Sequence, residues 1–139
     1  MDSQSTSIEF RRTGYSVRER WGDAVPGGET GFQPVPDVLL RSQSRLGVSN
    51  TQLAVLLNIT LHWWHSERWP YPRPSTIAKR MGTDVRTVER AILKLEEKSL
   101  VRRLPPERNE DNLVVRRFDL SGLVKTCTEI AREMRAGRE

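Results

Sequence analysis

A group of basic and hydroxyl side chains lies in one short stretch of sequence, at positions that face away from the apolar residues between them: Arg86, Thr87, Arg90 and Lys94. Arginine presents a planar fork of donors that matches O6 and N7 of guanine, or two phosphate oxygens. A threonine hydroxyl suits a phosphate oxygen, and its methyl group suits the methyl of thymine. If a helix presents these residues on one face, the set predicts contact with a nucleic acid.

Other chemistries find less support in the sequence. His62 and His65 are three residues apart, a spacing that metal sites can use, but no cluster of carboxylates or cysteines accompanies them. No Ser/His/Asp or Cys/His set and no glycine-rich nucleotide loop stands out. We therefore expect structural or surface roles for both histidines, no metal, no cofactor and no enzymatic activity.

Charge and composition agree with a polyanionic partner. The 139 residues contain 23 lysines and arginines against 18 aspartates and glutamates, which gives a formal net charge of +5. Fixed cations attract phosphates and release their counterions. Cys127 is the single cysteine, the first residues lack the pattern of a secretory signal, and the longest apolar stretch is too short and polar to span a bilayer. These features predict a soluble, cytoplasmic protein that associates with the nucleoid.

The N-terminal part of the chain differs from the rest. Residues 1–31 are rich in glycine and in charges of both signs, which predicts a mostly irregular arm. Its aromatic residues are too many for a purely disordered tail, so part of the arm is expected to dock on the core or on a second subunit: Phe10, Tyr15 and Trp21.

Two helices are expected after this arm. The first is short and ends near Gly47, and the second has Ser49 as its N-cap. The second helix should end before Trp69, because Pro70 and Pro72 disfavour helix in the residues before them. Its apolar face is predicted from spacings of three and four: Leu53, Leu56, Leu57, Leu61 and Trp64.

The following stretch predicts two helices joined by a sharp turn. Pro74 and Ser75 open the first, which runs to Met81. Gly82 can adopt the positive φ that the turn requires, and Asp84 caps a helix over about residues 85–98. The apolar face of this helix is a regular set: Val88, Ala91, Ile92 and Leu95.

A β-hairpin and a last helix complete the expected order. Residues 100–104 and 113–118 read as two strands around a polar loop at 105–112, and the last helix covers roughly residues 122–135. Helices followed by a hairpin give a fold that is mainly α with a small β-hairpin, in the order of a winged helix-turn-helix. The predicted organisation is an arm at 1–31, a winged helix-turn-helix domain at 32–120, and a C-terminal helix at 121–139 that is a possible dimerisation element.

The stretch from Pro74 to Val101 resembles a bacterial winged helix-turn-helix domain. The resemblance rests on short segments that recur in that order: Ile77-Ala78, Met81-Gly82, Arg86-Thr87-Val88, Arg90-Ala91-Ile92, Leu95-Glu96-Glu97-Lys98 and Leu100-Val101. The upstream segment Phe32 to Leu40 is similar to the start of such modules in small regulators and in plasmid and phage replication initiators. The resemblance covers roughly residues 32–131. It implies that the N-terminal part of helix 85–98 reads base edges in the major groove of double-stranded DNA.

The resemblance and the residue types together assign a set of DNA contacts. Arg86 and Arg90 are expected to contact bases or nearby phosphates, and the start of helix 74–81 is expected to hold a phosphate with free amides and a hydroxyl. Half of the four wing arginines at 102–103 and 116–117 should face DNA, because residues alternate across a strand. The complete predicted set is Ser75, Thr76, Lys79, Asp84, Arg86, Thr87, Arg90, Lys94, Arg103, Arg108 and Arg116.

Three positions depart from the usual pattern of this family. Asp84 and Glu89 put negative charge at the reading surface, where they reduce phosphate affinity, or accept from cytosine N4, or orient an arginine. Ser99 replaces the glycine that usually follows this helix, which predicts mild strain in the turn.

A homodimer is expected from the remaining apolar residues. In the aromatic cluster at residues 63–71, Trp64 is predicted to pack in the core, Trp69 to cover helix ends, and Trp63 to mark a subunit contact. The last helix has a seam with spacings of four, three and four, which either packs back on the domain or pairs with its partner. The predicted dimer interface is Trp63, Leu123, Cys127, Ile130 and Met134.

The sequence thus favours a homodimeric, sequence-specific protein that binds double-stranded DNA and represses transcription by occupying an operator. Two alternatives stay open: a plasmid or phage replication or maintenance protein, and a winged helix that binds proteins instead of DNA. A small-molecule effector is neither required nor excluded by the sequence.

Overall fold

The computed structural model describes residues 17–27 and 30–137. Contacts divide the chain into two units, Met1–Val35 and Pro36–Glu139. The division thus follows Val35, a few residues beyond the expected end of the arm. Among the described residues, no helix is long and apolar enough to cross a membrane.

The first unit contains a helical turn at 17–21 and the 3-10 helix η1 at Gly22–Ala24, so this part of the arm is ordered where an irregular segment was expected. Arg18 stabilises the turn that follows, because its guanidinium donates to the carbonyl of Pro26 and pairs with Asp23 at 3.3 Å. Trp21 is 66% exposed. Phe10 and Tyr15 lie outside the described residues.

The second unit begins with two short helices in place of the single one expected. These are α2, Asp37–Arg41, and α3, Gln43–Leu46. The break falls at Ser42, a buried residue whose φ of −115° and ψ of 23° are not helical. Gly47 ends α3 in the left-handed conformation, with a φ of 73°.

Helix α4, Asn50–Thr60, begins as predicted, but its buried face differs from the prediction. Ser49 and Gln52 form a reciprocal capping box, with both hydrogen bonds at 3.1 Å. The buried residues are Val55, Leu56 and Ile59, whereas Leu61 is 40% and Trp64 74% exposed. The helix ends at Thr60, so Leu61 and Trp64 lie beyond it. The helical repeat of 3.6 residues therefore does not determine the direction of their side chains. The predicted core position of Trp64 is therefore wrong.

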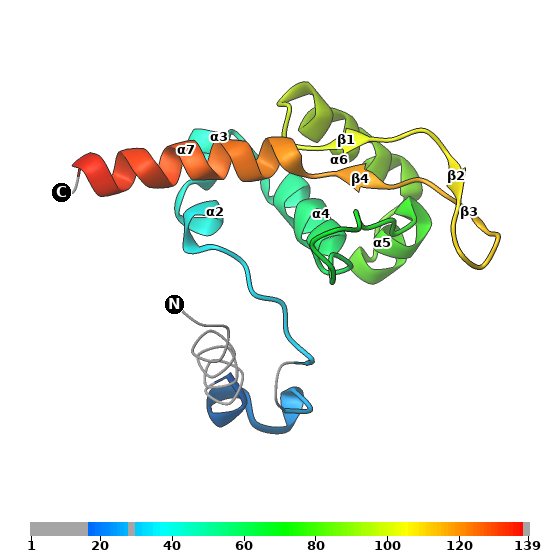
Figure 1. Cartoon of the computed structure of the whole chain (residues 1–139), viewed down its shortest axis with the longest axis horizontal. Coiled ribbons are helices and arrows are strands. Elements are labelled where there is room, and N and C mark those ends of the chain that lie inside the picture. The colour runs from blue at the N-terminus through cyan, green and yellow to red at the C-terminus, as the bar shows by residue number, and fades with distance from the viewer. Residues whose placement is uncertain (1–16, 28–29, 138–139) are drawn as a thin grey trace. The chain divides into compact units, whose positions relative to one another are not determined.

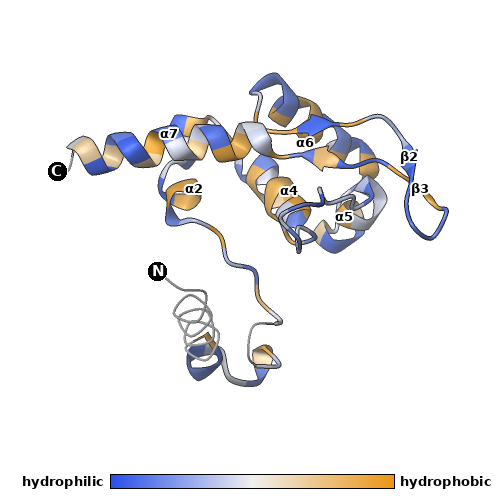
Figure 2. Ribbon diagram, viewed as in Figure 1, coloured by the Kyte–Doolittle hydropathy of each residue, from blue (hydrophilic) through white to orange (hydrophobic). Residues whose placement is uncertain are grey.

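Helices α5, Pro74–Met81, and α6, Val85–Glu97, follow the prediction closely. Gly82 makes the turn between them with a φ of 67°, and Asp84 Oδ1 accepts from the Thr87 amide at 2.7 Å. The face of α6 predicted to be apolar is the one that is buried, and it packs against both α4 and α5 (Figures 1 and 2). The three helices therefore share one core.

The hairpin consists of two short antiparallel ladders. Strand β1, Arg102–Arg103, pairs with β4, Phe118–Asp119, and β2, Glu107–Arg108, pairs with β3, Val114–Val115. The expected polar loop at 105–112 thus contains a strand. Arg103 pairs with Phe118, and Glu107 pairs with Val115. The chain advances four residues from Arg103 to Glu107 but three from Val115 to Phe118, so the first strand contains one extra residue between the two ladders. Pro105 and Pro106, which have no amide hydrogen to donate, lie where the register changes.

Helix α7, Ser121–Gly137, runs alongside α2 and is tied to α3 by the ion pair of Arg45 with Glu133 (Figure 1). Asp119 caps its start by accepting from the Ser121 amide at 2.8 Å. Gly122 allows the helix to approach the end of α6: a Cβ atom there would lie 2.0 Å from the Ser99 carbonyl oxygen. The fold is mainly helical with a small hairpin, in the predicted winged-helix order.

The turn after α6 has the strain expected of a serine at this position. Ser99 adopts a φ of 60°. Its amide donates to the Glu96 carbonyl at 2.9 Å, and the Leu100 amide donates to the Leu95 carbonyl at 3.0 Å. This is the Schellman arrangement, in which glycine is preferred because it has no Cβ atom.

Replacing Ser99 by glycine should therefore stabilise the protein. We expect S99G to raise the free energy of unfolding by about 0.5–1 kcal/mol, since relief of the left-handed strain exceeds the added entropy of the unfolded chain. Urea denaturation measures this difference. The control S44G, at an exposed helical position, should instead lower stability by about 0.5 kcal/mol. Equal destabilisation by both variants would contradict the strain at Ser99.

Candidate nucleic-acid interface

The outer face of α6 presents free cationic groups. Arg86 and Arg90 are exposed on the side opposite the buried residues, and neither guanidinium has a hydrogen bond or ion pair with any described residue. Lys94 continues this face but pairs with Glu97 at 3.4 Å. Helix α6 therefore presents two unpaired arginines about one turn apart, while its opposite face is packed in the core.

Leu93 also belongs to this face, and the sequence interpretation missed it. Its side chain is 58% exposed, about one helical turn beyond Arg90. An apolar group in this position suits the methyl group of thymine. The helical period places residue 93 away from Val88 and Ile92, so the same pattern that identified the buried face could have shown Leu93 to be exposed.

Asp84 has a local structural role at the start of α6. Hydrogen bonds from Thr87 are the main cause that lowers the pKa of this carboxyl, and the charges of Arg90 and Arg86 lower it further. One carboxylate oxygen is thus committed to the helix N-terminus, where negative charge is favourable. Thr87 is partly buried beside it. The predicted cap is thus present at Asp84, whose side chain remains exposed.

The start of α5 is open to solvent. Ser75, Thr76 and Lys79 are all exposed, and none of the three side chains has a hydrogen bond or ion pair within the described part of the chain. Pro74 has no amide hydrogen, and the amides of Thr76 and Ile77 donate to the Arg73 carbonyl at 2.9 and 3.1 Å. The expected set of free amides is therefore reduced, and a phosphate at this end would depend mainly on the exposed side chains.

His62 is engaged with a neighbouring arginine. Arg80 Nη1 lies 2.9 Å from His62 Nε2 and 3.4 Å from Asn58 Oδ1. Burial lowers the pKa of His62, and the charge of Arg80 lowers it further. Over residues 17–27 and 30–137, no group of three or more metal-ligating side chains gathers in one place.

The wing arginines split between two faces, as alternation predicts, and Arg103, one of the expected DNA contacts, lies on the inner face. Arg103 turns inward, where it pairs with Glu89 at 3.0 Å and lies 5.6 Å from the Phe118 ring centroid. Only 19% of its side chain is exposed, so it is not available to DNA. Glu89 is likewise neutralised within the chain. Arg102 faces outward in its place and pairs with Asp119 at 3.1 Å.

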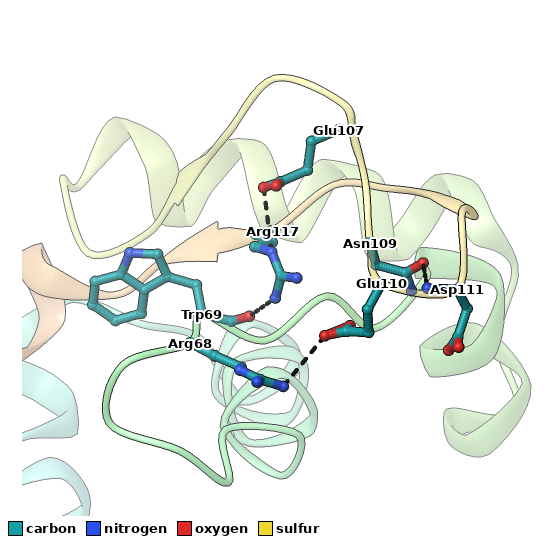
Figure 3. Close-up of polar contacts among 7 residues, drawn as sticks. All are labelled: Arg68, Trp69, Glu107, Asn109, Glu110, Asp111 and Arg117. Carbon is teal, nitrogen blue, oxygen red and sulfur yellow. Dashed lines mark hydrogen bonds and ion pairs between the residues drawn. The ribbon is translucent and has the colours of Figure 1, made fainter.

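The other wing arginines keep their predicted positions. Arg116 is exposed and donates to the Leu104 carbonyl at 3.0 Å, which leaves further donors free. Arg108 is exposed near the tip and donates to the Asn112 carbonyl at 2.9 Å. Arg117 is largely buried against the segment that joins α4 to α5, with its Nη1 2.8 Å from the Trp69 carbonyl (Figure 3).

The predicted dimer seam is mostly covered within the chain. Leu123, Cys127 and Ile130 are buried where α7 packs back on the domain, which was one of the two expected arrangements. Met134 remains 42% exposed, with its sulfur 3.9 Å from Ser42 Oγ. Trp63 is partly buried and its ring lies 5.4 Å from that of Trp69. Burial raises the pKa of the Cys127 thiol, which disfavours the reactive thiolate.

Comparison with known proteins agrees with this geometry. A family model described as a helix-turn-helix domain matches residues 46–101, which span α4, α5 and α6. The chain contains a helix-turn-helix domain. Among curated proteins, none matches the chain.

Three solved structures are similar to this chain to different degrees. The N-terminal domain of DnaD protein from Geobacillus kaustophilus HTA426 has a TM-score of 0.57 at 19% identity, over 87% of this chain and 92% of that one. YusO protein from Bacillus subtilis gives 0.42 at 18% identity, covering 100% and 88%. A possible transcriptional regulator from Methanosarcina mazei Go1 gives 0.40 at 18% identity, covering 74% and 88%. The DnaD domain therefore shares the fold of this helix-turn-helix protein.

The cap at Asp84 should make the stability of the domain depend on pH. Because the folded-state pKa is lowered, this carboxylate stabilises the fold above its ordinary pKa of 3.8, and the stabilisation is lost as the pH falls. In D84S the hydroxyl still caps the helix but does not titrate. We expect a shallower loss of unfolding free energy for D84S than for the wild type between about pH 5 and pH 3.

Urea denaturation over that pH range measures the slope. The matched variant D84A removes both cap and charge, so it should be less stable than D84S at neutral pH. A wild-type slope in D84S would contradict the assignment of this pH dependence to Asp84.

Proposed function

We propose that the protein binds double-stranded DNA in a sequence-specific manner by placing α6 in the major groove. The observation that carries this proposal is the pair of exposed, unpaired guanidinium groups at Arg86 and Arg90, on a helix whose opposite face is buried. A major groove accepts one helix, and bidentate arginine contacts to guanine are the commonest specific contacts in it. Leu93 adds an apolar group that suits thymine.

Phosphate contacts would come from elements on either side of α6. The start of α5 offers Ser75, Thr76 and Lys79, and the wing offers Arg116 and Arg108. Such contacts position a protein on the duplex but carry little sequence information. We assign these residues to affinity and register, and the α6 residues to base preference.

The biological role we propose is transcriptional regulation, with repression by occupancy of an operator. If the protein acts as the predicted homodimer, two copies of α6 would read half-sites about one helical turn apart, and the operator would be roughly palindromic. A dimer would need surfaces other than the buried part of the α7 seam. Leu40 on α2 and Met134 on α7 are exposed apolar residues that such a dimer surface could include.

Sequencing of genomic fragments bound by the purified protein tests this role. Enrichment of palindromic sites near promoters supports regulation. Enrichment of tandem repeats beside a replication gene replaces it with replication initiation or plasmid maintenance. Absence of duplex binding even at low salt, together with a protein that co-purifies, selects the protein-interaction alternative.

Loss of an α6 arginine should weaken and relax recognition. We expect R86A and R90A each to cost about 1–3 kcal/mol of binding free energy on the selected site and to reduce discrimination against mismatched sites. Fluorescence anisotropy with matched and mismatched duplexes measures both effects. The control K125A removes one exposed positive charge from α7 and should change neither the affinity nor the discrimination much. Full discrimination in the R86A/R90A double variant would overturn the assignment of base contacts.

Loss of a wing arginine should act differently. R116A should weaken binding to all sequences by a similar factor and reduce the dependence of log K on log salt by about one unit, as expected for a lost phosphate contact. Titrations at several salt concentrations on specific and random duplexes measure this slope. In R103A, where the side chain is turned toward Glu89, the slope should stay close to that of the wild type.

A further inference from the structure

A pocket of about 540 Å³ lies between the segment 62–73, which joins α4 to α5, and the tip of the wing (Figure 3). Its volume is within the range of small-molecule sites. The exposed face of α6 forms no part of its lining. The pocket is therefore a separate feature from the proposed base-reading surface.

Aromatic rings form much of this pocket. Trp64 is 74% exposed, and its ring lies 5.5 Å from that of His62. Trp69 is supported from behind by Trp63 at 5.4 Å, and Tyr71 is 39% exposed. Packing within the chain does not account for an indole as open to solvent as that of Trp64. Such surfaces suit planar rings, which stack on aromatic side chains.

Arginines that line the pocket differ in whether their guanidinium groups already have partners. Arg68 pairs with Glu110 at 3.4 Å. Arg117 pairs with Glu107 at 3.2 Å and donates to the Trp69 carbonyl (Figure 3). It also lies 4.8 Å from the Tyr71 ring centroid. Arg73 is exposed, and its guanidinium has no hydrogen bond or ion pair with a described residue. An anionic group placed here would gain charge-assisted hydrogen bonds without breaking an existing ion pair.

We propose that this pocket binds a planar aromatic anion, with its ring against Trp64 and Tyr71 and its negative group at Arg73. Two sources share this chemistry: a small aromatic carboxylate, and an unpaired nucleotide of a nucleic-acid strand. Both combine a ring that stacks with an anion that a guanidinium holds.

The pocket is connected mechanically to the wing. The Phe118 amide donates to the Pro70 carbonyl at 2.9 Å, and Arg117 and Arg68 add two further links between the same segment and the hairpin. A ligand between them contacts both parts. Any effect of the ligand on duplex binding rests on the proposed function, but the binding itself does not, so it is tested without DNA duplexes.

The test follows the indole N–H signals of ¹⁵N-labelled protein by NMR during titration with 1-naphthoate. Signals of Trp64 and Trp69, which line the pocket, should shift. Two matched probes dissect the recognition: 1-naphthamide keeps the ring without the charge, and cyclohexanecarboxylate keeps the charge without the aromatic ring. Each should bind roughly tenfold more weakly than 1-naphthoate.

Variants test the assigned residues. W64L and R73Q alter exposed side chains, so signal dispersion should show that both remain folded, and each should weaken 1-naphthoate binding by roughly tenfold. R132Q, which alters an exposed arginine of α7 outside the pocket lining, is the control and should bind as the wild type does.

Titration with thymidine monophosphate and with a short oligothymidylate distinguishes the two sources. Tighter binding of the oligothymidylate, lost in W64L and R73Q, identifies an unpaired strand as the ligand, and tighter binding of 1-naphthoate identifies a small aromatic acid. Absence of Trp64 and Trp69 shifts with every probe at millimolar concentration, or equal binding by W64L, R73Q and the wild type, overturns the proposal.

Discussion

The burial of one face of α6 is the interaction on which the rest of the structure depends. Val88, Ala91, Ile92 and Leu95 fill the space between α4 and α5, so the helix is held from two sides. This packing fixes the rotation of α6 about its axis and turns Arg86 and Arg90 toward solvent. A backbone held in this way loses less freedom on binding than a mobile loop would. The hydrophobic core and the proposed reading surface are therefore two sides of one helix.

The accuracy of the sequence interpretation varied with how strongly the local pattern constrained the structure. In α6 the apolar residues fit one face only, and Gly82 and Asp84 mark the turn and the cap, so face and start were both predictable. In α4 the apolar residues surround more of the helix, and several faces fit. The end of that helix at Thr60 decided between them, and no glycine or proline next to it marked this end in the sequence.

The wing shows a different limit. The alternation of side chains along a strand predicts that Arg102 and Arg103 point to opposite sides, but it does not predict which of them points inward. Glu89 and Phe118 decide this, because together they provide an ion pair and an aromatic ring for Arg103. Glu89 is fourteen residues from Arg103, in α6, and Phe118 is on the returning strand, so the choice depends on tertiary contacts. The exposure of Trp64 and the pocket beside it have the same origin, since both need the wing and the segment before α5 to be placed together.

The change of register at Pro105 and Pro106 has a consequence for how the hairpin behaves among other chains. A two-stranded hairpin has two outer edges whose unpaired amides and carbonyls can recruit strands of neighbouring molecules, which leads to aggregation. Here the Phe118 amide of β4 already donates to the Pro70 carbonyl, so it is not available to another chain. On the opposite side of the hairpin, Pro105 and Pro106 have no amide hydrogen to donate at the point where the extra residue interrupts the ladder. Charged residues, Arg103 and Glu107, lie on either side of these two prolines in the sequence. The irregularity that divides the wing into two ladders thus also protects a basic, exposed hairpin from growing into an intermolecular sheet.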